Sequence, residues 1–402
     1  MAKYIILTLL VILFLILFPF YPTAIFISAI ALLFVFNKLY TSIVVKNFRI
    51  ERYLETTKIF HGDNSLAGLK VYNKSIFPIV LYVYDYTSME LSLKQKETFF
   101  VFLPPKSSKT LNYRIVGTKR GDHYLGPTVV EFKDIFMNTF ISKEFETTGF
   151  VTVFPSILAY SNIEKSILQP YGEIKNKLPI FEDITKIQGI REYQQGDEIR
   201  KINWKVSARH NKLYVNYYTP SVSSGSVVIL NLYHPDYDMK YPEFYEEFSI
   251  ELATTIVFDL NKYGQEVGFI TSGEIRRKST TQSKSMIENP VGFLEMPISS
   301  GNSHITDILE VLAKIHPQNK TNLKSTFQNI SIQVSWGTAI ILITPNLDEE
   351  TAILLTDYIK KGHEVFIFNT HPHKTINYSF SSRIKLFNTL KVENTVQLEK
   401  VI

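Results

Sequence analysis

The sequence predicts a multidomain protein in which a membrane-spanning helical hairpin is followed by an all-β module and then by an α/β domain. Three observations carry this prediction: an almost wholly apolar N-terminus, a run of short β-type segments up to about residue 154, and alternating strands and helices after residue 222. The 402 residues leave room for two soluble domains with their own cores beside the membrane segment.

The N-terminal segment predicts two membrane helices. Its first 36 residues carry one charge, at Lys3, and are otherwise almost wholly apolar. At about 1.5 Å per residue this is too long for one upright helix across a core of roughly 30 Å. Pro19 and Pro22 divide the segment, so we expect helices at Ala2 to Phe18 and Thr23 to Tyr40. A single anchor and a cleaved signal peptide are the alternatives.

The basic residues around the hairpin predict its orientation. Lys3 lies at one end, and Lys38, Lys46, Arg49 and Arg52 lie at the other, so both flanks fall on the same side of the membrane. Lys and Arg are enriched in cytoplasmic flanks. We therefore expect a two-pass protein of the cell (plasma) membrane with its soluble domains in the cytoplasm.

The next part of the chain is typical of an all-β module. Turn residues at 62–64, 73–75 and 104–105 separate segments that are rich in Val, Ile, Leu and Tyr. We expect strands at Leu66 to Tyr72, Ile76 to Tyr86, Thr98 to Leu103, Thr110 to Val116, Thr128 to Phe132 and Phe150 to Phe154. Regular short strands of this kind predict an immunoglobulin-like sandwich, with the role of a spacer or recognition module without chemistry.

The last 180 residues change to alternating strands and helices. We expect strands at Ser226 to Leu232, Gln265 to Thr271, Thr338 to Ile343 and Glu364 to Asn369, and helices at Tyr241 to Lys262, Ile305 to Ile315 and Leu347 to Lys361. This order predicts a doubly wound, largely parallel sheet.

The most distinctive stretch of the sequence is residues 191–209. Asp197 follows Gly196 and precedes good helix formers, so we expect it to cap a helix N-terminus. Arg200 and Trp204 are four residues apart and share a face of that helix, where a guanidinium can lie over an indole ring.

A basic surface borders this stretch. Residues 200–220 contain five Lys or Arg residues and no acid. Ile199, Ile202 and Val206 occupy another face of the expected helix and would dock it on a core. Lys201, Lys205 and Lys212 are the candidates for exposed contacts with a partner, because surface charges steer association.

A family resemblance rests on this stretch, which we call the hallmark. Its matching positions are Arg191, Tyr193, Gly196, Asp197, Arg200, Trp204, Ser207 and Arg209. On them the chain resembles the bacterial and archaeal family catalogued as domain of unknown function 58. A second match lies at 119–127 and 134–136, where Ile135 and Met137 replace the Pro and Gly of the family pattern. The resemblance covers most of the chain.

The resemblance also implies that the C-terminal half is like a von Willebrand factor A domain. The implied domains are a hairpin at 1–40, a β-sandwich at 41–155, a hallmark segment at 156–222 that packs on the next domain, and a von Willebrand factor A-like domain at 223–402. Such domains often bind a divalent cation through an Asp and two Ser residues after the first strand. Asn231, Tyr233 and Pro235 stand at these positions here, so we expect no metal.

Two interpretations of the hallmark remain open. Arg191, Asp197, Arg200 and Arg209 can form a structural network, with Trp204 filling a seam against the sheet. Alternatively, part of this Arg–Trp cluster faces a partner, since such clusters beside unpaired positive charge are typical of interface hot spots.

The composition argues against several classes of site. The net charge of +5 is modest and spread along the chain, and the absence of cysteine excludes disulfides and thiolate metal sites. No phosphate-binding loop, zinc-protease motif or nucleophile elbow occurs. His371 and His373 stand two apart without a third ligand at suitable spacing, so we expect solvated loop residues. We therefore expect no cofactor, nucleic acid, small-molecule substrate or enzymatic activity.

Three functions follow from these observations. The favoured one is a membrane-anchored cytoplasmic interaction or scaffold protein. For it, the family resemblance implies a MoxR-type AAA+ ATPase as partner, in maturation or remodelling of an envelope or enzyme complex. The second is a cell-surface adhesion or envelope-binding protein, which requires the soluble part to lie outside. The third is an uncharacterised hydrolase or transferase, which the lack of a recognisable nucleophile and base disfavours.

Overall fold

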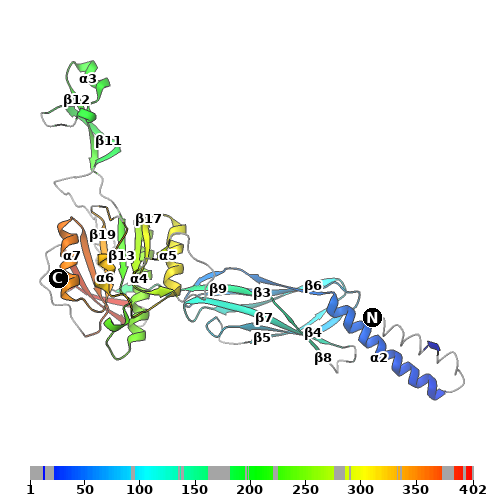
Figure 1. Ribbon diagram of the computed structural model, residues 1–402. Helices are drawn as coiled ribbons and strands as arrows, with labels where there is room; N and C mark the ends of the chain where they lie inside the picture. The colour runs from blue at the N-terminus through cyan, green and yellow to red at the C-terminus, as the bar shows by residue number, and fades with distance from the viewer. Residues whose placement is uncertain are drawn as a thin grey trace. The chain divides into compact units, whose positions relative to one another are not determined.

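The computed structural model describes most of the chain. The described residues are 12–13, 22–91, 96–134, 136, 140–161, 182–194, 197, 199–220, 225–275, 286–288, 291–332, 334–335, 337–373, 384–392 and 395–400. The chain divides into two compact units, Met1–Ser156 and Ile157–Ile402, which we call unit 1 and unit 2 (Figure 1).

Unit 1 begins with an apolar helix, α2 (Pro22–Lys46). Within the described residues, its segment Ile25–Lys46 is the one helix that is long and apolar enough to cross a membrane, with a mean hydropathy of 1.8. The helix continues past Tyr40, where the sequence analysis ended it. Apart from residues 12–13, the first predicted helix, Ala2 to Phe18, lies outside the described residues.

The extension of α2 has a packing reason. Tyr40 and Val44 are buried in the core of unit 1, and the Tyr40 hydroxyl donates a hydrogen bond to the Pro78 carbonyl at 2.7 Å. The Asn37 amide donates to the buried Asp134 carboxylate at 3.2 Å. The last turns of α2 are therefore part of the β domain's core, and only Asn47 separates the helix from the first strand.

Two β-sheets follow the helix. The first, in the order β1-β3-β6, is antiparallel and consists of β1 (Phe48–Leu54), β3 (Asn64–Asn73) and β6 (Ser107–Val116). The second runs in the order β2-β9-β7-β4-β5 and consists of β2 (Lys58–Phe60), β9 (Gly149–Phe154), β7 (Gly121–Lys133), β4 (Ile79–Thr87) and β5 (Lys96–Leu103), with β8 (Phe140–Phe145) paired to β7.

The two sheets pack face to face. Leu69 and Val71 of β3 meet Leu81 and Val83 of β4 in one core, and all four side chains are fully buried. Alternate residues of β4 are buried, which is the period-2 pattern of a strand with one face inward. Each predicted strand has a counterpart, but Ile76 to Pro78 form a loop, because proline has no N–H for the ladder.

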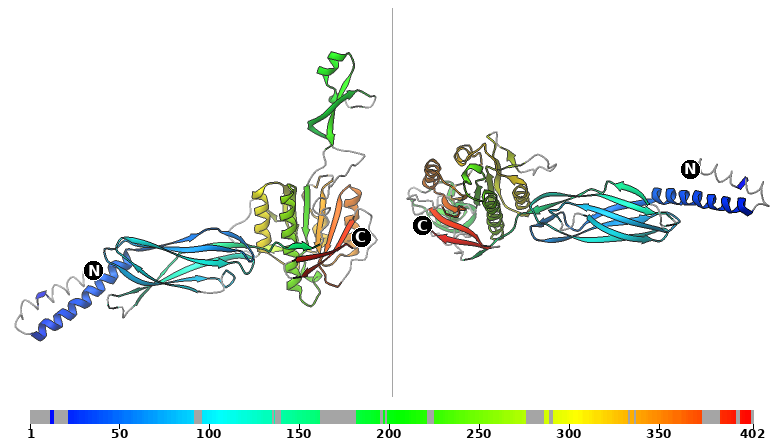
Figure 2. Two further views of the ribbon diagram at one scale, coloured as in Figure 1. Left: turned by 180° about the vertical axis from the view of Figure 1, so that it is seen from behind. Right: turned by 90° about the horizontal axis from the view of Figure 1, so that it is seen from below.

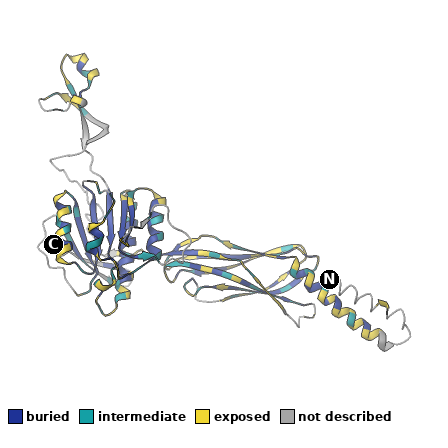
Figure 3. Cartoon of the chain, in the orientation of Figure 1, coloured by how far each residue is buried: buried dark blue, intermediate teal, exposed yellow. Residues whose placement is uncertain are grey.

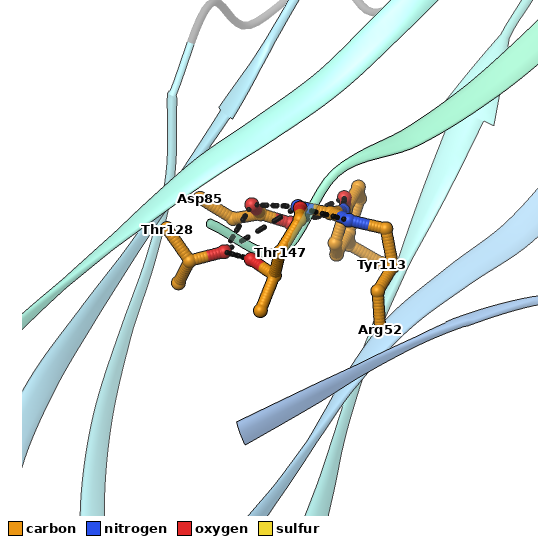
Figure 4. Close-up of polar contacts among 5 residues, drawn as sticks. All are labelled: Arg52, Asp85, Tyr113, Thr128 and Thr147. Carbon is orange, nitrogen blue, oxygen red and sulfur yellow. Dashed lines mark hydrogen bonds and ion pairs between the residues drawn. The ribbon is translucent and has the colours of Figure 1, made fainter. Parts of the chain in front are cut away.

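A buried ion pair joins the two sheets (Figure 4). Arg52 of β1 donates two hydrogen bonds to the Asp85 carboxylate of β4, at 2.9 and 2.6 Å. The Tyr113 and Thr128 hydroxyls also donate to Asp85, at 2.5 and 2.9 Å, and the Arg52 Nε donates to the Thr147 carbonyl. The network satisfies both charges, as buried ions require.

Unit 2 is built on a nine-stranded sheet. Its order is β10-β22-β21-β20-β19-β13-β14-β17-β16. The five central strands are parallel: β13 (Gly225–Leu230), β14 (Glu266–Thr271), β19 (Ala339–Thr344), β20 (Glu364–Asn369) and β21 (Ile384–Val392). The others are β10 (Ala159–Ser161), β16 (Ile287–Glu288), β17 (Leu294–Ser299) and β22 (Thr395–Lys400).

Helices cover both faces of this sheet (Figure 2). Leu323 of α6 (Leu323–Gln328) and Leu355 of α7 (Glu349–Lys360) share a core with alternate residues of the parallel strands. The opposite face contacts α4 (Pro242–Lys262), which packs beside α5 (Asn302–Lys314). β13 is buried along its whole length, as expected for a parallel strand covered on both faces. A short pair, β15 (Glu274–Ile275) and β18 (Ile315–His316), completes the unit's main body.

Candidate interaction surface around Trp204

The hallmark lies on two strands and the turn between them. β11 (Glu182–Glu192) pairs antiparallel with β12 (Tyr214–Pro220). Between them lie a 3₁₀ turn, η1 (Ile199–Lys201), and a short helix, α3 (Trp204–His210). Ile202 forms a bridge with Val215, and both side chains are buried. This bridge fixes the two helical pieces to the strand pair.

The predicted single helix is wrong, and so is its predicted cap. Asn203, not Asp197, caps α3: its side-chain oxygen accepts the Val206 N–H at 3.1 Å. Its amide donates to the Asn216 side chain at 2.8 Å. Because Ile202 is drawn into the bridge, the backbone leaves the helical path between η1 and α3. Arg200 and Trp204 therefore do not share one helix face.

Asp197 instead closes the turn that precedes η1. Its carboxylate accepts two hydrogen bonds from the Arg191 guanidinium, at 2.8 and 2.6 Å, and one from the Gln194 N–H at 2.8 Å. These hydrogen bonds hold the pKa of Asp197 below its ordinary value, the largest cause being the Arg191 side chain. The expected pairing of Asp197 with an arginine is thus present. Gly196 and the Arg200 side chain lie outside the described residues.

Two further hallmark residues make hydrogen bonds at the start of β12: Ser207 holds α3 against it, and Tyr193 joins the end of β11 to the residue before it. The Ser207 hydroxyl is buried and accepts the Tyr214 N–H at 2.8 Å. The Tyr193 N–H donates to the Leu213 carbonyl at 2.9 Å. Ser207 therefore has a structural role, because its hydroxyl takes the place of a backbone hydrogen-bond partner for Tyr214. The residue type alone did not indicate this role.

Trp204 is an exposed large apolar side chain of α3. It is 64% exposed, and Ile199 on the preceding turn is 70% exposed. Isolated exposed apolar residues are normal, but a large aromatic side chain beside charge is typical of binding surfaces. The expected contact of Trp204 with the sheet of the α/β domain stays a prediction.

Several basic residues lie on α3 and next to it in the sequence. Lys205 and Arg209 are exposed, and neither has an ion-pair partner among the described residues. Lys212 is exposed but pairs with Glu192 at 3.1 Å. Lys201 is half-buried. Of the three predicted contact lysines, Lys205 is therefore the one whose charge is available to a partner; Arg209 is a further cation with the same property.

The predicted cation-site positions form a closed polar cluster at the carboxyl end of β13. Asn231 is fully buried, and its amide donates to the Asp236 carboxylate at 2.7 Å and to the Thr344 hydroxyl at 3.0 Å. Its side-chain oxygen accepts from the Tyr233 N–H and the Ser272 hydroxyl. The Asn231 amide N–H₂ thus bridges the oxygens of Asp236 and Thr344. From the sequence, Asp236 was discounted because it lies past Pro235, but its carboxylate returns to the end of the strand and accepts from Asn231.

Two further positions complete this edge of the sheet. Tyr233 and Pro235 lie at and after the start of a 3₁₀ turn, η2 (His234–Asp236). His371 and His373 lie in the loop after β20, where the His373 N–H donates to the His371 ring at 3.1 Å. Across the residues described, no group of three or more His, Cys, Asp or Glu residues has the arrangement of a metal site.

Comparison with known proteins supports one family. Residues 189–371 match the model of the family described as "Protein of unknown function DUF58". The "Uncharacterized protein YeaD" of Bacillus subtilis (strain 168) is 23% identical over 278 residues, which cover 68% of this chain. The chain spans 63% of the length of that relative.

Two of the solved structures that are similar to this chain cover 26% and 27% of it. The CARDB domain of a Pyrococcus furiosus protein is 19% identical and covers 26% of this chain and 91% of that one, with a TM-score of 0.21. Escherichia coli alpha-2-macroglobulin is 19% identical and covers 27% of this chain and 7% of that one, with a TM-score of 0.23.

Proposed function

We propose that this chain, whose residues 189–371 match the DUF58 family model, is a membrane-anchored, non-catalytic interaction or scaffold protein. One observation carries the proposal: the short helix α3 carries both Trp204, 64% exposed, and the exposed cations Lys205 and Arg209, which are four residues apart and share a face. We call these three residues the α3 surface. An aromatic anchor flanked by arginine and lysine suits a partner with an apolar pocket and an acidic rim.

The proposed partner is a MoxR-type AAA+ ATPase, acting in maturation or remodelling of an envelope or enzyme complex. The resemblance of the hallmark to its family supports this choice. The apolar helix α2 supports a membrane anchor. We further propose two membrane helices and cytoplasmic soluble domains, since Lys38, Lys46 and Arg49 follow the apolar segment.

The folds of the two units fit this role. We propose that unit 1 is an immunoglobulin-like spacer, which two packed antiparallel sheets support. We propose that unit 2 is a von Willebrand factor A-like domain with a degenerate cation site. Its parallel sheet with helices on both faces supports this, as does the Asn231 amide that bridges Asp236 and Thr344.

Capture of the ATPase tests the proposal. The purified full chain in detergent is immobilised, and binding of a MoxR-type ATPase from the same genome is measured for Trp204→Ala and for the pair Lys205→Glu with Arg209→Glu. Hot-spot truncation costs about 2 kcal/mol or more, or about thirtyfold in affinity. We expect a loss of this size for Trp204→Ala, with an unchanged melting temperature because the side chain is exposed.

A matched control is Ile353→Ala on α7, since Ile353 is 59% exposed. It should bind the ATPase as the natural chain does. Equal capture by all variants would exclude the α3 surface as the docking site. Failure of the natural chain to capture the ATPase would exclude this partner.

A further inference from the structure

A loop of unit 1 reaches back along α2 towards its apolar part. The Phe77 ring packs edge-on against Phe36 at 6.2 Å and against Tyr40 at 5.6 Å between centroids. The Tyr40 hydroxyl donates to the Pro78 carbonyl in the same loop. The loop between β3 and β4 therefore lies beside the helix at the level of residues 36–40, well before the helix ends.

A second loop reaches the same level. Asp134, just after β7, accepts the Asn37 amide, and Phe136 follows two residues later. Lys38 is the first charged residue of α2. The large apolar residues before it, such as Phe34 at 63%, are exposed (Figure 3). If α2 crosses a membrane, Lys38 marks the boundary between hydrocarbon and headgroups, and both loops lie at that boundary.

Both loops carry an exposed apolar side chain at this level. Ile76 is 66% exposed and Phe136 is 51% exposed. The opposite ends of the strands lie far from this boundary: Leu66, for example, is seven residues before Asn73 on β3, or about 23 Å at roughly 3.3 Å per residue. The position of Ile76 and Phe136 beside the candidate membrane helix distinguishes them from scattered exposed residues.

Two lysines lie at the same end of unit 1. Lys74 and Lys106 line an open hollow of about 320 Å³ together with Ser107 and Ser108. The Lys74 N–H donates to the Asn47 carbonyl directly after α2, and the Lys106 N–H donates to the Ser75 carbonyl. Neither ammonium group has an ion-pair partner in the part of the chain that the structure describes. The hollow therefore offers two cations and the Ser108 hydroxyl, which are the kinds of group that bind phosphate oxygens; the Ser107 hydroxyl already donates to the Pro104 carbonyl at 2.7 Å.

We propose that this end of unit 1 is a membrane-contact surface that binds anionic lipid. Ile76 and Phe136 enter the headgroup layer, and Lys74 and Lys106, with Lys38, bind lipid phosphates. Basic residues beside a membrane helix attract anionic lipid, and their long stems allow the ammonium group to reach the interface. The proposal rests on the membrane anchor of the proposed function, but not on the ATPase.

Because the chain contains no cysteine, single labels can report the depth of each position. The full chain, carrying Phe34→Cys, Ile76→Cys, Phe136→Cys or Leu66→Cys with a fluorescent label, is reconstituted into vesicles of phosphatidylcholine and phosphatidylglycerol that contain brominated lipid. We expect bromine to quench the label at positions 34, 76 and 136 but not at position 66, which is also exposed, at 41%.

The outcomes separate the anchor from the surface. Quenching at position 34 alone would overturn the membrane-contact surface and keep the anchor. No quenching at position 34 would overturn the anchor and, with it, this proposal.

Charge reversal tests the lipid phosphates. In vesicles with phosphatidylglycerol, quenching at position 76 should exceed that in pure phosphatidylcholine vesicles, and Lys74→Glu with Lys106→Glu should abolish the difference. Lys119→Glu is the matched control, because Lys119 is exposed in the turn after β6 at the opposite end of the sheet. If the double reversal leaves the difference intact, the hollow does not bind anionic lipid.

Discussion

Two arginine–aspartate pairs of nearly equal geometry occupy opposite environments in this protein. Arg52 and Asp85 meet at 2.9 and 2.6 Å inside unit 1, and Arg191 and Asp197 meet at 2.8 and 2.6 Å in the hallmark. The side chains of the first pair are 5% and 0% exposed, and those of the second are 46% and 18% exposed. The two pairs have nearly the same geometry, so their different burial is what distinguishes their roles.

The surroundings of the two pairs differ accordingly. Tyr113 and Thr128 donate to the buried Asp85 carboxylate, and the burial of the phenol, followed by the proximity of Asp85, raises the pKa of Tyr113. Water can replace any partner of the exposed pair, but not of the buried one. The first pair therefore holds two sheets together, whereas the second shapes a turn.

The largest effect is expected from breaking the buried pair. Asp85→Ala leaves Arg52 uncompensated, and the free energy of unfolding of unit 1 should fall by about 3–5 kcal/mol. Hydrogen exchange of β3 and β4 in the full chain measures this loss. Arg52→Met combined with Asp85→Leu should cost less than Asp85→Ala alone, since no charge is then left unpaired. Surface ion pairs contribute up to about 1 kcal/mol. If Asp85→Ala cost less than that, the buried pair would not differ from the exposed pair in its contribution to stability.

A smaller loss is expected from one supporting hydroxyl. Tyr113→Phe removes the hydrogen bond to Asp85 and should cost about 1.5–3 kcal/mol, the range for hydrogen bonds to charged groups. The same exchange measurement applies. Tyr124→Phe is the control, because Tyr124 is 55% exposed and its change should leave unit 1 unaffected. Equal effects of the two substitutions would contradict a special role for the buried network.

The helix cap of the hallmark should contribute less again. Asn203→Ala removes the acceptor of the Val206 N–H and should destabilise α3 and its strand pair by about 1 kcal/mol. Hydrogen exchange in α3 reports this local change. Asn203→Ser keeps a good capping oxygen and should retain most of the protection; faster exchange in Asn203→Ser than in Asn203→Ala would show that the cap does not matter.

The smallest effect is expected from the exposed pair. Asp197→Asn should shift the melting temperature less than Asn203→Ala, and added salt should shrink the shift, because surface ion pairs are screened. The pKa of Asp197 is lowered in the folded chain, so its contribution is present above the ordinary value near pH 4 and is lost as pH falls through the lowered pKa. If the difference in melting temperature between the natural chain and Asp197→Asn stayed the same through this pH window, the assignment of Asp197 to the ion pair would be contradicted.

The fold was largely predictable from apolar patterns. β4 alternates buried and outward residues, and β13 is a continuous apolar run, so period and length found both strands. β1 was missed because Arg49 and Arg52 were assigned to the basic flank of the membrane segment. Arg52 points inward only because Asp85, 33 residues later, supplies the opposite charge. Such a pairing depends on tertiary structure and leaves no local signal.

The hallmark was predictable in its residues but not in its shape. Both Asp197 and Asn203 are good capping types, and sequence reasoning chose the first. The β-bridge between Ile202 and Val215 makes Asn203 the cap of α3, because this bridge ends η1 before α3 begins. Asn203 lies between Ile202, the last well-buried apolar residue of the hallmark, and the first residue of α3. This position would have identified Asn203 as the cap if a shorter helix had been predicted.

The short join between α2 and β1 also has a mechanical meaning. Only Asn47 separates the helix from Phe48, so tension on the proposed anchor that is not taken up by the packing of Tyr40 and Val44 in the core passes directly to the first residue of a strand. There it meets seven residue pairs between β1 and β3. It also meets the Arg52 side chain, which ties the same strand to β4 in the facing sheet. Beyond the contacts of α2 itself, a pull on the proposed anchor is thus resisted by one strand register and one buried ion pair, with no slack linker between helix and strand.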